Sequence, residues 1–103
     1  MAHYVVMIKS SAKPGQEQAY EAWYNSTHLA EVLAVEGFRS GRQFRLPPGG
    51  SHTHAAIFDL ETDDPTQTLA RLGEAFRSGS MTPTEALDTA VPPESLVLTP
   101  TAS

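Results

Sequence analysis

Four side chains that could together form a site for proton transfer lie close in the sequence, at Trp23, Tyr24, Asn25 and His28. An imidazole titrates near neutral pH, so His28 could act as a general acid or base. The Tyr24 hydroxyl could donate a hydrogen bond, and the Asn25 amide could stabilise a developing negative oxygen. Trp23 could form an aromatic wall for a flat substrate. The alternative role is structural, with His28 bonding a backbone carbonyl and both aromatic rings packing in the core.

Arg42 and His54 are two further candidates for contact with a substrate. Arg42 could bind a carboxylate or an enolate, and its alternative is an ion pair across a dimer interface with Asp59 or Glu61. His54 begins an apolar segment and could line a pocket. His52 and His54 could share one side of a strand and hold a metal ion, but no third ligand is evident, so we expect no metal site.

Composition narrows the classes of function. The 103-residue chain is short enough to form one domain, residues 1–103. Its 12 Asp and Glu outnumber its 7 Lys and Arg, which argues against a nucleic-acid partner. It has no Cys, so thiol catalysis and thiolate metal sites are excluded. We find no pattern of a signal peptide, a membrane span or a phosphate-binding loop, and we expect a cytoplasmic protein without a nucleotide cofactor.

The elements needed to position these residues are predicted in the order strand, helix, strand, strand, helix, strand. Apolar β-rich segments, helix caps and breakers place them at Tyr4–Ile8, Gln16–Val35, Phe38–Leu46, His54–Leu60, a helix opened by Asp64-Pro65, and Glu94–Leu98. A further short helix is expected from Thr82-Pro83 to about Asp88, because this motif repeats the cap.

Two local features follow from the residue types. Asn25, Ser26 and Thr27 are weak helix formers, so the first helix should be irregular just before His28. Its apolar face is predicted to contain Ala19, Ala22, Trp23, Ser26, Ala30 and Leu33, with Tyr20 and Tyr24 beside it. Alternation places on one face of the second strand the side chains of Phe38, Ser40, Arg42, Phe44 and Leu46.

This order of elements is the ferredoxin-like βαββαβ pattern of the α+β class. It predicts a four-stranded antiparallel sheet with both helices on one face. Three of the predicted strands are apolar on both sides, so the face without helices would be left exposed. A two-fold homodimer with the sheets packed face to face would cover it.

The segment Trp23–Phe38 reads Trp-Tyr-Asn-Ser-Thr-His-Leu-Ala-Glu-Val-Leu-Ala-Val-Glu-Gly-Phe, and an Arg-rich strand follows it. Together they resemble the dimeric α+β barrel superfamily, and within it the EthD-like small proteins. The resemblance implies a ferredoxin-like dimer with a pocket between sheet and helices. It also implies cofactor-free oxygenation, isomerisation, cyclisation or related proton transfer, while other members of the superfamily bind haem.

We therefore predict a cofactor-free enzyme that catalyses an isomerisation, cyclisation or lyase reaction on a small cyclic or aromatic carbonyl compound. His28 would move the proton, Tyr24 and Asn25 would stabilise the oxyanion, and the substrate contacts would come from Trp23, Arg42 and His54. One alternative is a cofactor-independent monooxygenase of a phenolic substrate. Others are a non-catalytic small-molecule-binding or accessory protein, and a haem protein with His28 as axial ligand.

Overall fold

The computed structural model describes residues 2–102. Its elements are β1 (Ala2–Ser10), α1 (Glu17–Trp23), η1 (Tyr24–His28), α2 (Leu29–Leu33), β2 (Phe38–Arg45), β3 (His54–Thr62), α3 (Pro65–Arg77) and β4 (Glu94–Leu98). Because α1, η1 and α2 follow one another without a break, they form a single helical unit. The predicted order of strands and helices is confirmed.

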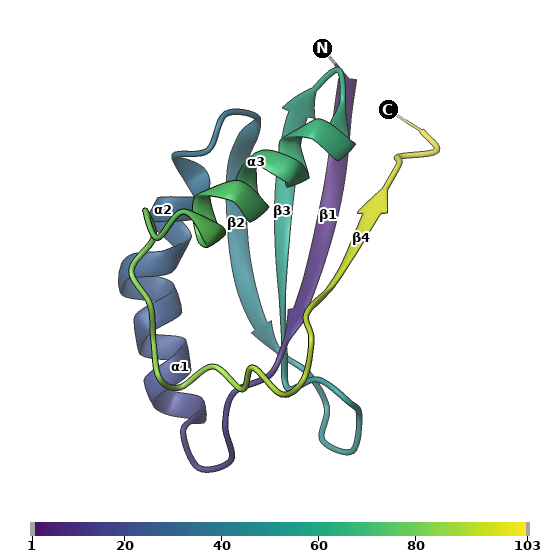
Figure 1. The fold of residues 1–103 in the computed structure, drawn as a ribbon. Helices are drawn as coiled ribbons and strands as arrows, with labels where there is room; N and C mark the ends of the chain where they lie inside the picture. Colours follow the sequence, from purple (N-terminus) through teal and green to yellow (C-terminus); the bar gives the residue numbers. More distant parts are fainter. Residues whose placement is uncertain (1, 103) are drawn as a thin grey trace.

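The strands pair in the order β2-β3-β1-β4, and each neighbouring pair is antiparallel. The α1–α2 unit and α3 both lie over the same face of this sheet (Figure 1). The arrangement is the ferredoxin-like α+β fold that the element order predicts. Within residues 2–102, no helix is long and apolar enough to cross a membrane.

The core lies between the sheet and the helices. Val6 of β1 and Phe58 of β3 are register partners, and both are fully buried together with Leu60. The helical elements contribute to the same core the side chains of Tyr20, Tyr24, Val32 and Leu72. This layer fixes the distance between the first helical unit and the strands beneath it.

The predicted apolar face of the first helix is correct in part. Trp23 and Leu33 pack against the core as predicted, but the face is rotated by about one residue. Its alanines are exposed, at Ala19, Ala22 and Ala30. The buried side is instead formed by residues four apart, Tyr20, Tyr24, His28 and Val32. Long aromatic rings reach the sheet where small alanine side chains would leave a gap, so the rings take the inward positions.

Gly41 allows β2 to approach the helical layer closely. A Cβ atom at this position would lie 2.3 Å from the Phe58 ring and 3.3 Å from the Leu29 side chain. Such separations are far below van der Waals contact, so any side chain here would displace Phe58. Because Gly41 has no side chain, the Phe58 ring can occupy this space.

The prediction for the faces of β2 is correct from Ser40 onward and wrong at Phe38. Phe38 pairs with Leu60, whereas Ser40 pairs with the adjacent Asp59. A β-bulge between them adds one residue and reverses the facing. Phe38 is consequently buried against Phe58, with ring centroids 5.5 Å apart. The face away from the helices receives Ser40, Arg42, Phe44 and Leu46.

The predicted helix over residues 82–88 is also wrong, because this segment contains no helix. Its backbone pairs with the chain between β1 and α1. Lys13 N donates to Ala86 O and Asp88 N donates to Ser11 O, each at 2.8 Å. Backbone groups used in this way cannot also close helical turns, so the long-range pairing overrides the local cap signal.

The helices leave the outer face of the sheet uncovered (Figure 1). The strand register places on it Val5, Met7, Phe44, Ala55, Ile57, Leu96 and Leu98. Phe44, Leu96 and Leu98 are 43–45% exposed. A continuous apolar surface of this kind is unusual on an isolated monomer.

Replacing Gly41 by Ala should lower the free energy of unfolding by about 1–3 kcal/mol, because the new methyl group would overlap the Phe58 ring. Urea unfolding followed by circular dichroism measures this change. Gly50→Ala is the matched control, since its Cβ would meet nothing closer than 4.0 Å. Equal stability losses in the two variants would contradict the close approach at Gly41.

Candidate active site

The first helical unit contains a π-helical turn, η1, where the sequence predicts an irregularity. Two side chains in this turn bond back to the preceding helix. Asn25 Nδ2 donates to Glu21 O at 2.9 Å, and Ser26 Oγ donates to Ala22 O at 2.6 Å. Such bonds compete with regular helical pairing, and π turns are frequent at functional sites. The turn ends at His28, so the irregularity lies directly beside the candidate base.

His28 lies inside a cluster of aromatic rings and is only 5% exposed. Trp23 stacks on it, with ring centroids 4.5 Å apart and planes 17° apart. Tyr24 meets it edge-on at 4.8 Å, and Phe76 of α3 does so at 5.2 Å. The cluster thus joins the first helical unit to α3 through the imidazole.

The electrostatic environment keeps His28 neutral at pH 7. Burial lowers its pKa from 6.5 to about 4, and the nearby Glu31 carboxylate opposes this shift only in part. The Nδ1 atom is enclosed and has no hydrogen-bond partner among the described residues. Glu31 Oε1 lies 4.0 Å from it, which is too far for a hydrogen bond and close enough for electrostatic attraction.

Tyr24 shares the same dry environment. Burial, reinforced by the neighbouring Tyr20 phenol, raises the pKa of Tyr24 well above its usual value. Its hydroxyl therefore keeps its proton at all ordinary pH values. Next to a neutral imidazole it can serve as a hydrogen-bond donor and not as a base.

Residue 82 ties the segment after α3 to this cluster. Thr82 N donates to both carboxylate oxygens of Glu31 at 3.1 Å, and Thr82 Oγ1 donates to Oε2 at 2.8 Å. Trp23 Nε1 donates to Thr82 O at 3.2 Å. One residue thereby holds both the ring that stacks on His28 and the carboxylate that faces it.

His54 belongs to a separate polar network. Its Nε2 is 2.7 Å from Glu21 Oε2, and its Nδ1 is 2.7 Å from Thr53 Oγ1. Arg45 Nε donates to the same Glu21 oxygen at 2.7 Å. A hollow of about 250 Å³ adjoins this network, lined by Glu21, Asn25, Gln43, Phe44, Arg45 and His54. His54 is fully buried with both ring nitrogens paired, as in a structural histidine.

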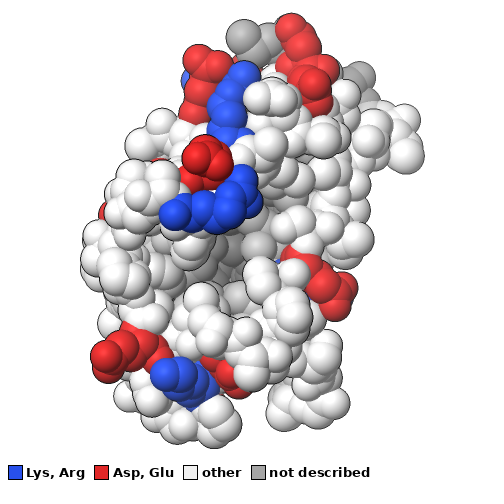
Figure 2. Space-filling view, in the orientation of Figure 1, with Lys and Arg blue, Asp and Glu red and all other residues white. Residues whose placement is uncertain are grey.

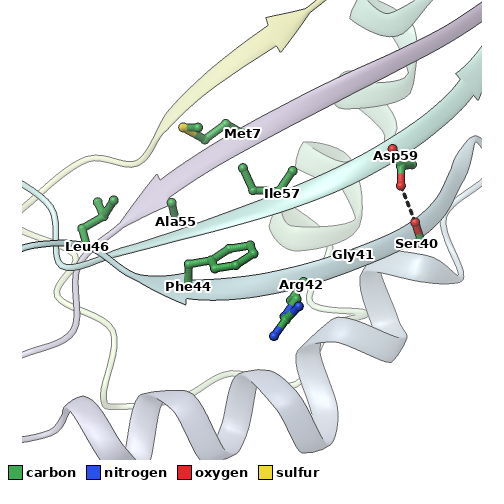
Figure 3. Close-up of a pocket in the computed structure, with 9 residues that line it drawn as sticks. All are labelled: Met7, Ser40, Gly41, Arg42, Phe44, Leu46, Ala55, Ile57 and Asp59. Carbon is green, nitrogen blue, oxygen red and sulfur yellow. Dashed lines mark hydrogen bonds between the residues drawn. The ribbon is translucent and has the colours of Figure 1, made fainter. Parts of the chain in front are cut away.

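Arg42 lies on the opposite face of the sheet from His28. It borders a second hollow, of about 570 Å³, on the outer face of the sheet. Figure 3 shows that Met7, Ala55, Ile57 and Phe44 stand on one side of the sheet around this hollow. The guanidinium lies 5.3 Å from the centre of the Phe44 ring, and among residues 2–102 it forms no ion pair.

The structure thus divides the residues that the sequence suggested for one site. Trp23, Tyr24 and His28 come together, Asn25 and His54 line the polar hollow near β2, and Arg42 lies across the sheet. A single pocket in one subunit that combines Arg42 with His28 is therefore not formed, because the sheet separates them.

The spacing of three residues predicts that Glu31 can share a helix face with His28, and the structure places its carboxylate opposite the ring. Sequence reasoning missed two other contributors to the His28 cluster, Phe76 and Thr82, because they are distant in sequence and no local pattern links them to His28. Within the described residues, no group of three or more His, Asp and Glu side chains could hold a metal ion.

Figure 2 shows the helix-bearing face of the molecule. Its charged side chains stand in small separate groups, and positive and negative residues neighbour one another. The face is recessed between these groups. No broad patch of one sign is present on this view.

Comparisons with known proteins support the fold. No protein-family model matches the chain, and no curated protein matches it in sequence. Among solved structures, the haem degrader MhuD from Mycobacterium tuberculosis, with two haems bound in its active site, gives a TM-score of 0.70 at 13% identity, covering 97% of each chain. A proposed monooxygenase from Shewanella loihica gives 0.64 at 10% identity, covering 99% of this chain and 97% of the other.

A mutant of SnoaB, a cofactor-independent oxygenase from Streptomyces nogalater, gives a TM-score of 0.58 at 14% identity, covering 100% of this chain and 97% of SnoaB. The chain is therefore structurally similar to dimeric α+β barrel proteins, which include cofactor-independent oxygenases and a haem degrader.

The residues around His28 do not fit a haem. An axial ligand needs a ring nitrogen open to the iron, with space beside it for the porphyrin. Here the Trp23 ring stacks on one face of the imidazole, Phe76 covers it from α3, and neither of the two hollows described above includes it. The hollow on the helix side, at about 250 Å³, is lined by polar side chains and does not include His28.

The lowered pKa of His28 makes stability depend on pH. Above pH 6.5 the ring is neutral in both folded and unfolded chains, so burial carries no protonation penalty. As the pH falls from 6.5 to about 4, only the unfolded chain binds the proton. The free energy of unfolding should therefore drop by about 3 kcal/mol over this interval relative to a His28→Gln variant. Urea titrations at several pH values measure the difference, and parallel pH profiles would contradict a buried neutral ring.

Proposed function

We propose that this protein is a cofactor-independent monooxygenase that acts on a phenolic substrate, with His28 as the base. The observation that carries the proposal is the neutral imidazole enclosed by Trp23, Tyr24 and Phe76. A neutral imidazole has a free lone pair at pH 7. Because burial also lowers its affinity for a proton, the transfer depends on the phenolate that forms beside it, whose negative charge stabilises the imidazolium. The likeness in fold to a cofactor-independent oxygenase and to a proposed monooxygenase agrees with this chemistry.

The reaction begins when His28 takes the phenolic proton of an electron-rich substrate, such as the enol form of an anthrone. The resulting anion, and not the protein, supplies the electrons that reduce dioxygen. A carbon–oxygen bond forms to give a peroxide, and the His28 imidazolium returns the proton to it. Loss of one water molecule then leaves a quinone, so one O₂ yields one ketone oxygen and one water.

The aromatic surroundings assist each step. A dry site strengthens the hydrogen bond between the Tyr24 hydroxyl and the substrate anion. The Trp23 ring keeps the imidazole in one orientation by stacking at 4.5 Å. Phe76 is 46% exposed and covers the imidazole from α3, so rotation of this side chain would admit the substrate.

This function is favoured over an isomerase, cyclase or lyase by the positions of two residues. Those reactions were expected to use Asn25 for the oxyanion and Arg42 for an acidic substituent. The Asn25 side chain donates one N–H to Glu21 O and lines the polar hollow beside His54, and Arg42 lies on the other face of the sheet. A phenolate that reacts directly with oxygen needs fewer such contacts. The specific likeness of Trp23–Phe38 to EthD-like proteins stays a prediction.

We also infer that two copies pair through the outer face of the sheet. Phe44, Leu96 and Leu98 are the large apolar side chains exposed there, and the hollow beside Ile57 offers them a recess. Arg42, which has no acidic partner within the described chain, can reach an acidic side chain of the second copy across a two-fold axis. Burial of about 800 Å² on each copy is the usual size of a stable interface.

Oxygen uptake with an anthrone, corrected for spontaneous oxidation, tests the proposed reaction. His28→Gln should lower the rate about 10²–10⁴-fold, because the glutamine cannot take the phenolic proton. His3→Gln is the matched control, since this exposed histidine lies outside the cluster, and it should keep the wild-type rate. Turnover without oxygen uptake would identify an isomerase or lyase instead. Tight substrate binding with no turnover would identify a binding protein.

Light scattering at a series of concentrations tests the pairing of subunits. We expect a dimer for the wild type and a monomer for Ile57→Arg, because a buried unpaired guanidinium is costly at a sheet interface. Ala70→Arg places the same charge on an exposed position of α3 and should stay dimeric. A monomeric wild type would show that another partner, or none, covers the outer face.

A further inference from the structure

We propose that Glu31, held in place by Thr82, positions His28 by fixing which ring nitrogen carries the proton. The effect on catalysis rests on the proposed function. The positioning itself follows from the hydrogen bonds that join Trp23, Glu31 and Thr82. Neither Glu31 nor Thr82 would touch the substrate, so both are positioning residues.

The carboxylate of Glu31 has little freedom to move. It accepts three hydrogen-bond contacts from Thr82, two from the backbone N–H at 3.1 Å and one from the hydroxyl at 2.8 Å. A contact from a hydroxyl to an ionised carboxylate is stronger than one between neutral groups. With the carboxylate fixed, Oε1 stays 4.0 Å from His28 Nδ1.

This carboxylate is the only ionised group facing the imidazole among the described residues that contact it. Trp23 and Phe76 present apolar rings, and Tyr24 presents a phenol that keeps its proton. A negative charge opposite Nδ1 favours the tautomer with hydrogen on Nδ1, because the N–H dipole then points toward it. Nε2 is left with the lone pair that accepts the substrate proton.

The same threonine also controls the stacking ring. Its carbonyl accepts the hydrogen bond from Trp23 Nε1, at 3.2 Å. The segment between α3 and β4 thereby acts on the imidazole from two sides, through the Trp23 ring and through the Glu31 carboxylate. Substitution of the Thr82 side chain affects only the second link, because the first uses the backbone.

The experiment records nitrogen-15 spectra of His28 at pH 7, where the chemical shifts of the two ring nitrogens report the tautomer. The wild type should hold the proton mainly on Nδ1. Glu31→Gln should reduce this population, and Thr82→Val should reduce it less, since the backbone N–H donor stays. Thr82→Ser keeps the hydroxyl and should restore the wild-type spectrum. In oxygen uptake, Glu31→Gln should lower kcat about tenfold with KM changed less than twofold.

The tautomer is measured without substrate, so it separates this inference from the proposed reaction. A wild type with the proton on Nε2, or a tautomer unchanged in both Glu31→Gln and Thr82→Val, would overturn the inference even if oxygen uptake is confirmed. A tautomer that changes as expected in a protein without oxygen uptake would support the positioning role and reject the reaction. If Glu31→Gln fails to fold, the Thr82→Val and Thr82→Ser pair gives the same decision.

Discussion

The removal of one imidazole from water is the constraint on which the other features of the site depend. His28 is buried because Tyr20, Tyr24 and Val32, at spacings of four residues, face the sheet on the same side of the helical unit. Burying the ring without a hydrogen-bond partner at Nδ1 costs less free energy when the imidazole is neutral than when it is charged. The ring therefore stays neutral at pH 7 with a free lone pair, and the same burial lowers its affinity for a proton.

The sheet divides the molecule into two surfaces with different tasks. Toward the helices it carries Val6, Phe58 and Leu60, which support the aromatic cluster. Away from the helices it carries apolar side chains that no part of the described chain covers. Arg42 belongs to this outer surface, on the opposite side of the sheet from His28. A two-layer α+β fold produces this division whenever both helices pack on one face.

Several predictions from sequence failed for identifiable physical reasons. The cap signal at Thr82-Pro83 suggested a helix, but the backbone of this segment pairs with residues near Lys13. Strict alternation put Phe38 on the outer face, but a bulge reversed it. In both places a long-range pairing outweighed a local preference. The candidates Asn25 and His54 each form a hydrogen bond with Glu21, and their proposed contacts with a substrate stay a prediction.

The sequence alone determined the order of the elements, the irregular turn before His28 and the presence of an uncovered apolar face. These features follow from periodicity, caps and weak helix formers, which act over a few residues. Only the tertiary structure decided which side chains surround the imidazole, because Phe76 and Thr82 reach it from segments far along the chain. Burial and proton affinity are properties of that assembled environment, and no local pattern in the sequence encodes them.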